Sequence, residues 1–173
     1  MKKKVIPISL IALILCLALP MTAFAQYLSY GWPSKSIPIN QYSYNSQWQP
    51  NMDAAVSSWN NAGAKITFSK SSSSVNKIYA AQYSDTWYGL NTCWHSGSTV
   101  TKFEIKLNSR TIAADATNFG NFVRSVFVHE LGHSIWLSDN PNTTSSSIMK
   151  YSRNRNTMTS PQTYDINSVK AKY

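Results

Sequence analysis

The clearest pattern of apolar and polar positions is a strict alternation over residues 102–108. Phe103, Ile105 and Leu107 fall on one face of an extended chain, and charged side chains alternate with them. This period of two predicts a β-strand with one buried face. The charged opposite face indicates a sheet that the rest of the protein covers on one side only.

A period close to four marks the longest predicted helix, which begins at about residue 118 or 121 and ends near residue 137. Val123, Phe127, Leu131 and Ile135 recur every four residues, a spacing that places them on one helix face. Other apolar residues widen this stripe, so we expect the helix to be buried over much of its surface. Pro141 cannot continue the backbone hydrogen bonds and is expected to stop it.

Weaker patterns predict the remaining elements. They are an extended segment over residues 26–44, a helix over 53–62, strands over 66–68 and 78–83, and a closing helix over 161–172. Neither an internal repeat nor a long linker divides the chain. These patterns favour an α+β fold with a twisted mixed sheet, an active-site helix and a C-terminal helix.

The first 25 residues have the pattern of a bacterial-type signal peptide. Three lysines precede an apolar run, and residues 23–25 (Ala-Phe-Ala) offer the small side chains at which signal peptidases cleave. We therefore expect residues 1–25 to be removed, residues 26–173 to form a single domain, and the product to be secreted. The apolar run is too short for a stable membrane span.

Charge narrows the range of partners. Loss of the three N-terminal lysines takes the Lys and Arg count from 16 to 13 against 7 acidic residues, a net charge near +6. This excess is compatible with association with an anionic cell-wall surface; a basic protein without such a partner is an equally good interpretation. The sequence has no Lys/Arg-rich helix and no basic-aromatic repeat, so nucleic acid is not an expected partner.

Cys93 is the only cysteine after residue 25, which excludes a disulfide within the predicted domain. A buried free thiol is the preferred interpretation, because unpaired cysteines are commonly buried. An intermolecular link and a metal-reactive thiol stay open. We expect a monomer whose fold rests on its core and on a bound metal.

The candidate chemistry lies on the longest predicted helix, in the run His129-Glu130-Leu131-Gly132-His133. Two histidines four residues apart project from one helix face, where both imidazoles can reach a single zinc ion. Glu130 lies beside the first histidine and can remove a proton from a water that zinc polarises. The pattern predicts peptide-bond hydrolysis with Zn²⁺ as cofactor and Glu130 as catalytic base.

A catalytic zinc needs a third protein ligand. No glutamate follows Glu130, which leaves two downstream aspartates. Asp139 comes six residues after His133, where the chain can turn back to the metal, and it is the preferred ligand. Asp165 stays open as the alternative; its other interpretation is a carboxylate that interacts with backbone N–H groups at a helix end.

Two segments carry a resemblance to a known family. Residues 129–139 resemble the metzincin pattern of two histidines, a glycine and a further histidine or aspartate, and the aspartate version looks like that of the secreted snapalysins. Residues 147–151 (Ser-Ile-Met-Lys-Tyr) resemble the metzincin Met-turn, whose methionine lies under the zinc site. The resemblance implies a metzincin-like catalytic domain, similar to that of matrixins, in which Met149 packs under the metal. It also implies that Tyr151 approaches the zinc and stabilises the transition state. The alternative for Tyr151 is a surface aromatic in a basic loop.

Trp136 departs from the metzincin pattern. It stands three residues after the second histidine, where family members have a glycine in a strained turn. Because tryptophan disfavours positive φ, we expect the helix to run further or to end differently, which weakens the assignment of Asp139.

The resemblance also implies that a protein or peptide substrate lies extended along an exposed sheet edge above the metal. Residues 83–104 are the expected neighbourhood, and Trp87, Tyr88, Trp94 and His95 either line the cleft or pack in the core. The predicted function is a secreted zinc endopeptidase acting on extracellular proteins. The rival is a secreted binding or adhesion module whose zinc is structural or lost, which four protein ligands would favour.

Overall fold

The computed structural model describes residues 26–140 and 142–173. The predicted signal peptide lies outside these residues. Within them, no helix has the length and apolar character needed to cross a membrane. The elements in chain order are β1 (Ser36–Ile39), α2 (Gln49–Asn60), β2 (Thr67–Lys70), β3 (Lys77–Ala81), β4 (Gly89–Ser96), β5 (Thr99–Asn108), α3 (Ser109–Asp115), α4 (Phe119–Ser134) and α5 (Thr163–Lys170).

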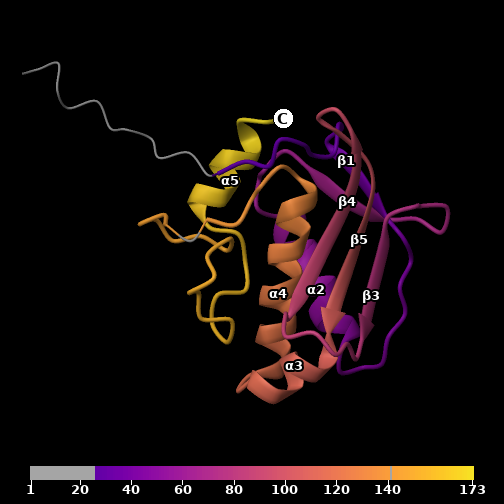
Figure 1. Cartoon of the computed structure of the whole chain (residues 1–173), viewed down its shortest axis with the longest axis vertical. Helices are drawn as coiled ribbons and strands as arrows, with labels where there is room; N and C mark the ends of the chain where they lie inside the picture. The colour runs from indigo at the N-terminus through magenta and orange to yellow at the C-terminus, as the bar shows by residue number, and fades with distance from the viewer. Residues whose placement is uncertain (1–25, 141) are drawn as a thin grey trace, which may run out of the picture.

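The strands form two small sheets, one of which is mixed. In the larger sheet, β5 lies in the middle, parallel to β3 and antiparallel to β4 (Figure 1). The second sheet is the parallel pair of β1 and β2. The buried amide of Asn76 links the two sheets, because it donates to the Pro38 carbonyl oxygen at 2.7 Å and accepts from the Phe103 N–H at 3.0 Å.

The alternation in residues 102–108 is confirmed, and the strand that carries it is longer than predicted. Phe103, Ile105 and Leu107 have no exposed surface, whereas the charged residues between them are half-buried. The apolar face packs toward α4, which also packs against α2 (Figure 1). The indole of Trp59 on α2 donates to the Val128 carbonyl oxygen at 2.8 Å and so joins the two helices inside the core.

Several predicted boundaries need correction. The long helix ends at Ser134 rather than near residue 137, so Pro141 is not what stops it. The helix predicted over residues 53–62 is α2, which begins earlier because Pro50 fits its first turn. The sequence patterns did not predict β4 or α3. The residues of β4 alternate between half-buried and exposed, so this strand carries no apolar stripe.

Candidate metal centre

The face of α4 that carries His129 and His133 holds both rings in fixed orientations. The Nδ1 atom of His129 lies 3.0 Å from the Ile148 carbonyl oxygen, and that of His133 lies 2.9 Å from the Leu137 carbonyl oxygen. Each Nδ1 therefore carries the ring proton and donates it, which leaves each Nε2 with a free lone pair. Burial lowers the pKa of His129 to about 3, which keeps its ring neutral.

The chain leaves α4 through a left-handed residue. Trp136 has a φ of 80°, and the next N–H, that of Leu137, donates back to the Gly132 carbonyl oxygen at 3.1 Å. This is the position in which helix ends usually place glycine. The expectation that tryptophan would force another exit was wrong. The chain turns back directly after the helix, despite a cost of about 1–2 kcal/mol for a left-handed side-chain-bearing residue.

Contacts of the Trp136 ring and backbone explain how the strained turn is tolerated. The Trp136 carbonyl oxygen accepts from the Leu28 N–H at 2.8 Å. Its ring covers Gly31, where a Cβ would lie only 2.4 Å from the indole. The Lys172 ammonium lies 4.7 Å from the ring centroid. The N-terminal segment and the C-terminus thus hold Trp136 in place.

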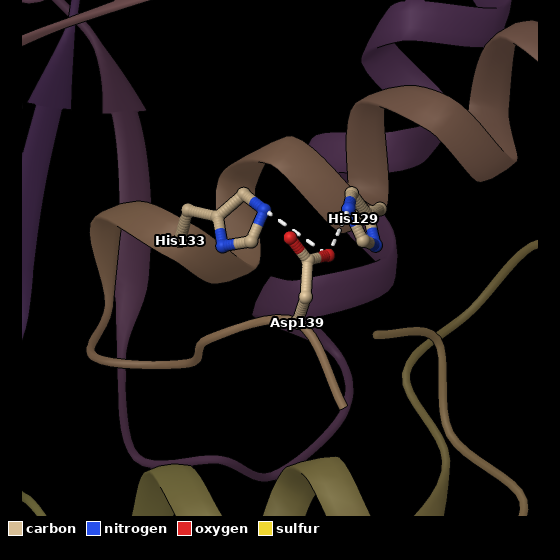
Figure 2. A group of neighbouring side chains, drawn as sticks. All are labelled: His129, His133 and Asp139. Atoms are coloured by element: carbon tan, nitrogen blue, oxygen red, sulfur yellow. Dashed lines mark ion pairs between the residues drawn. The ribbon is translucent and has the colours of Figure 1, made fainter. Parts of the chain in front are cut away.

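The reversed chain brings Asp139 between the two imidazoles, as Figure 2 shows. Its Oδ1 atom lies 3.2 Å from His129 Nε2 and 3.8 Å from His133 Nε2. Its Oδ2 atom accepts a hydrogen bond of 2.6 Å from the Tyr151 hydroxyl. Burial raises the pKa of Asp139, but the hydrogen bond that it accepts from the Tyr151 hydroxyl and its place beside the two imidazoles hold the net pKa below its usual range. Asp139 is therefore a carboxylate.

The three ligand atoms fit a divalent cation. All lie within 4.8 Å of one another, and a tetrahedral zinc with bonds of about 2.0–2.1 Å would separate its ligand atoms by about 3.3 Å. Asp139 Oδ1 is buried and has no hydrogen-bond partner. It faces two nitrogen lone pairs across short distances, an arrangement that repels unless a positive charge lies between them.

Asp165, the alternative ligand, does not lie in this group. It has no exposed surface, and its carboxylate accepts hydrogen bonds from the Ser147 hydroxyl at 2.6 Å and from the Ile148 and Gln162 N–H groups, each at 2.8 Å. These bonds attach the segment containing Met149 to the start of α5. Asp165 thus has the role of a helix-terminal carboxylate.

Glu130 lies beside the candidate metal centre without belonging to it. Its Oε1 atom is 4.0 Å from His129 Nε2, and the residue is 5 % exposed. Burial raises its pKa to about 7. Gly89 makes room for it, because a Cβ at that position would lie 2.6 Å from Glu130 Oε1. The Asn91 amide donates to the Glu130 carbonyl oxygen at 2.7 Å, which holds β4 against α4.

Met149 and Tyr151 differ in burial and in what they contact. Met149 is fully buried, and its sulfur packs so closely on Gly132 that a Cβ there would approach it to 2.7 Å. Tyr151 is 56 % exposed. Its hydrogen bond to Asp139 is the first cause that raises its pKa to about 12, so its hydroxyl stays protonated and can donate.

Two cavities meet at this centre. One, of about 340 Å³, contains the metal-facing side chains together with residues of β4 and of the N-terminal segment; its other lining residues include Leu28, Tyr30, Gly89, Asn91 and Cys93. The second, of about 210 Å³, lies beyond Glu130 and is lined by residues that include Trp87, Tyr88, Arg153 and Arg155. The N-terminal segment and the two arginines were not predicted as site residues, because the first lies far from both motifs in sequence and the arginines belong to a loop that the sequence marks only as basic.

The other aromatic residues proposed for the cleft separate into two groups. Trp87 and Tyr88 line the second cavity. Trp94 is 44 % exposed, and the ring of His95 stacks on Tyr30 with centroids 4.2 Å apart. Cys93 is a free, half-buried thiol that faces the first cavity. Burial raises its pKa to about 12, so the metal-free protein carries it as a neutral thiol, and it does not belong to the group of possible metal ligands.

Comparisons with known proteins support the fold more than the activity. No model of a known protein family matches the sequence, and no curated protein does. The structure is similar to a chain of the GM1-bound form of the ECX AB5 holotoxin, with a TM-score of 0.57, 15% sequence identity and 84% of each chain covered. It also matches high choriolytic enzyme 1 (HCE-1), a hatching enzyme zinc-protease from Oryzias latipes (Medaka fish), with a TM-score of 0.47 and 14% identity over 88% of this chain and 94% of that chain. The holotoxin chain shares the fold; neither similarity assigns an activity to this chain.

Proposed function

We propose that the chain is a secreted zinc-dependent endopeptidase of the metzincin type, which hydrolyses extracellular proteins. His129, His133 and Asp139 would hold the zinc. The observation that carries the proposal is the buried Asp139 Oδ1 atom, which has no hydrogen-bond partner and faces two imidazole lone pairs. A cation that these three atoms share would satisfy all of them.

Bound zinc supplies a Lewis acid that lowers the pKa of water and polarises the substrate carbonyl. The protein supplies the proton transfers. The carboxyl of Glu130 opens onto both cavities, where it can accept a proton from water. The same carboxyl, once protonated, can deliver the proton to the leaving amine nitrogen.

Tyr151 supports the site from its exposed side. Its hydroxyl fixes the orientation of Asp139 through a 2.6 Å hydrogen bond. The same hydroxyl lines both cavities, where it can donate to an oxygen that gains negative charge during the reaction. Tyr151 is therefore proposed as a catalytic residue that also positions a metal ligand.

The proposed substrate path follows β4. This strand ends the sheet order, and on its other side the described residues contain no paired strand. An extended peptide can add to such an edge through main-chain hydrogen bonds. The β4 residues Gly89, Leu90, Asn91 and Cys93 line the first cavity, so a peptide bound there would pass in front of Glu130.

A secreted binding or adhesion module with a structural zinc is the second candidate. Structural zinc is normally enclosed by four protein ligands. Within residues 26–140 and 142–173, the group of possible ligands contains only two histidines and one aspartate. Burial of the Glu130 carboxyl beside the centre costs free energy, and a structural zinc site has no need of such a group. The geometry thus favours the enzyme.

The experiment compares the two glutamates of the chain. Glu130→Ala is expected to retain zinc and to lose casein cleavage by a factor of about 10²–10⁴, the usual contribution of a general base. Glu104→Ala is the matched control, because Glu104 lies on the outer sheet face in an ion pair of 2.8 Å with Lys102. A chelator should abolish cleavage and added zinc restore it. Undiminished cleavage by zinc-loaded Glu130→Ala would refute the assigned base.

A further inference from the structure

The second cavity lies directly beside the candidate metal centre. It has a volume of about 210 Å³, and its walls are the segment that leads into β4, the α4 residues Val126 and Glu130, and the loop that follows Met149. A water occupies a share of about 30 Å³ in the liquid, so the cavity can admit a side chain. Two arginines, Arg153 and Arg155, line it.

Arg153 is only partly used by the fold. The residue is 7 % exposed; its Nε donates to the Ser125 hydroxyl at 3.2 Å, and its Nη1 donates to the Lys150 carbonyl oxygen at 2.9 Å. Its Nη2 atom makes no hydrogen bond with the residues that the structure describes. One end of a guanidinium anchored by its other two nitrogens is therefore available to the cavity.

Arg155 is also held in place without a counter-ion. Its guanidinium lies 4.8 Å from the centroid of the Tyr88 ring, and its Nε atom is buried with no hydrogen-bond partner. Among the described residues, no carboxylate oxygen lies within 4.0 Å of the guanidinium of Arg153 or Arg155.

Glu130 lines the same cavity and its charge acts on both arginines, but neither forms an ion pair, so a buried and a half-buried positive charge carry a free-energy cost. Burial lowers the pKa of Arg153 to about 9 and lowers that of Arg155 as well, which reports the same cost. An anion in the cavity would offset it. A carboxylate suits best, because a planar guanidinium binds its two oxygens through paired N–H donors.

The direction of β4 relates the cavity to one side of the cleaved bond. The strand begins at Gly89, which lines the cavity beside Glu130, and runs to Ser96. Antiparallel pairing is the slightly more stable arrangement, so a substrate strand added to β4 would run from the Ser96 end toward Gly89. Residues after the cleaved bond would then lie next to the two arginines.

We infer that this cavity binds an acidic side chain, and that the proposed peptidase cleaves bonds followed by aspartate or glutamate. The inference rests on the proposed function for the cleavage and on Arg153 and Arg155 for the acid preference. Arg155 contributes the main contact that can be tested, because it is only half-buried and its loss threatens the fold less than the loss of Arg153.

The first test maps cleavage sites. The zinc-loaded protein is incubated with a peptide library, and the products are identified by mass spectrometry. Aspartate and glutamate are expected to be enriched about tenfold over asparagine and glutamine directly after the cleaved bond, the effect of one strong charge-assisted contact. Arg155→Gln should lose the enrichment, and Arg155→Glu should favour lysine and arginine instead. Arg124→Gln is the matched control, because the Arg124 guanidinium bonds to Ser58 and lines a different cavity.

The second test separates recognition from catalysis. Binding of two peptides that differ only by aspartate or asparagine is measured by tryptophan fluorescence on Glu130→Gln protein loaded with zinc. The aspartate peptide should bind about tenfold more tightly, and Arg155→Gln should remove the difference. If no peptide is cleaved by the wild type but the binding difference follows Arg155, the peptidase proposal fails and the acid-binding cavity stands. Cleavage without acid preference, or a preference that survives Arg155→Gln, would overturn the inference and leave the peptidase intact.

Discussion

Replacement of Asp139 by alanine should weaken zinc binding, whereas replacement of Asp165 by alanine should destabilise the fold. The two carboxylates are the candidates that the sequence leaves for the third ligand. In the structure, Asp139 offers a bare oxygen to the two imidazoles, whereas Asp165 uses both oxygens in hydrogen bonds. The two variants should therefore fail in different assays.

The expected changes in stability follow from the hydrogen bonds that each variant removes. Asp165→Ala leaves the Ser147 hydroxyl and the Ile148 and Gln162 N–H groups without their acceptor. Unsatisfied buried donors cost about 1–3 kcal/mol each, so the free energy of unfolding should fall by about 3 kcal/mol or more. Asp139→Ala removes one hydrogen bond from the exposed Tyr151, so the zinc-free protein should change by about 1 kcal/mol or less.

Zinc affinity should fall more in Asp139→Ala than in Asp165→Ala, the reverse of the order expected for stability. Loss of an outer partner of a metal ligand costs about 10–100-fold in affinity, and loss of the ligand Asp139 should cost at least that much. Urea unfolding of the zinc-free protein measures the free energy of unfolding. Competition with a chromophoric chelator measures the zinc affinity. If Asp139→Ala retained wild-type zinc affinity while folded Asp165→Ala lost it, the assignment of the ligand would be wrong.

Three further changes test the surroundings of the centre. Trp136→Gly should destabilise the protein by about 1 kcal/mol less than Trp136→Ala, because both lose the ring contacts but only glycine relieves the left-handed backbone; equal unfolding free energies would contradict this. Tyr151→Phe should weaken zinc binding about tenfold, because Asp139 loses the partner that orients it, and unchanged affinity in the chelator competition would remove that role. For zinc-free protein, the pKa of Glu130 is raised to about 7, so its stabilising effect is complete below the unfolded pKa and is lost as pH rises through 7. The unfolding free energy of the wild type relative to Glu130→Gln should accordingly fall by about 3 kcal/mol from pH ~4 to pH ~8, and a difference independent of pH would refute the burial of that carboxyl.

The parts of the fold that periodicity predicts are those in which one face is apolar and buried. The alternation at Phe103, Ile105 and Leu107 and the four-residue period of α4 both report such a face, and both elements are present. Strand β4 lies at the sheet edge beside the cleft, with its residues half-buried or exposed, so its pattern carries no such signal. Sequence periodicity therefore missed the strand that the proposed substrate would contact.

In the candidate site too, the sequence predicts the residues that local spacing brings together and misses those placed by contacts distant in sequence. Spacing along one helix was enough to bring His129 and His133 together. The position of Asp139 depended on whether Trp136 could adopt positive φ, and contacts with Gly31 and Lys172, both far away in sequence, decided that question. Arg153 and Arg155 reach the cavity only because the loop after Met149 folds back over α4, which no local pattern indicates.

X-ray absorption at the zinc edge, together with the metal content of the purified protein, shows whether His129, His133 and Asp139 bind zinc. We expect one zinc per chain, bound by nitrogen and oxygen at about 2.0–2.1 Å, with no sulfur at about 2.3 Å. Loss of that signal in Asp139→Ala would link it to this centre. A correctly folded protein that takes up no zinc, or one whose zinc is bound through the Cys93 sulfur, would show that this centre is not the zinc site.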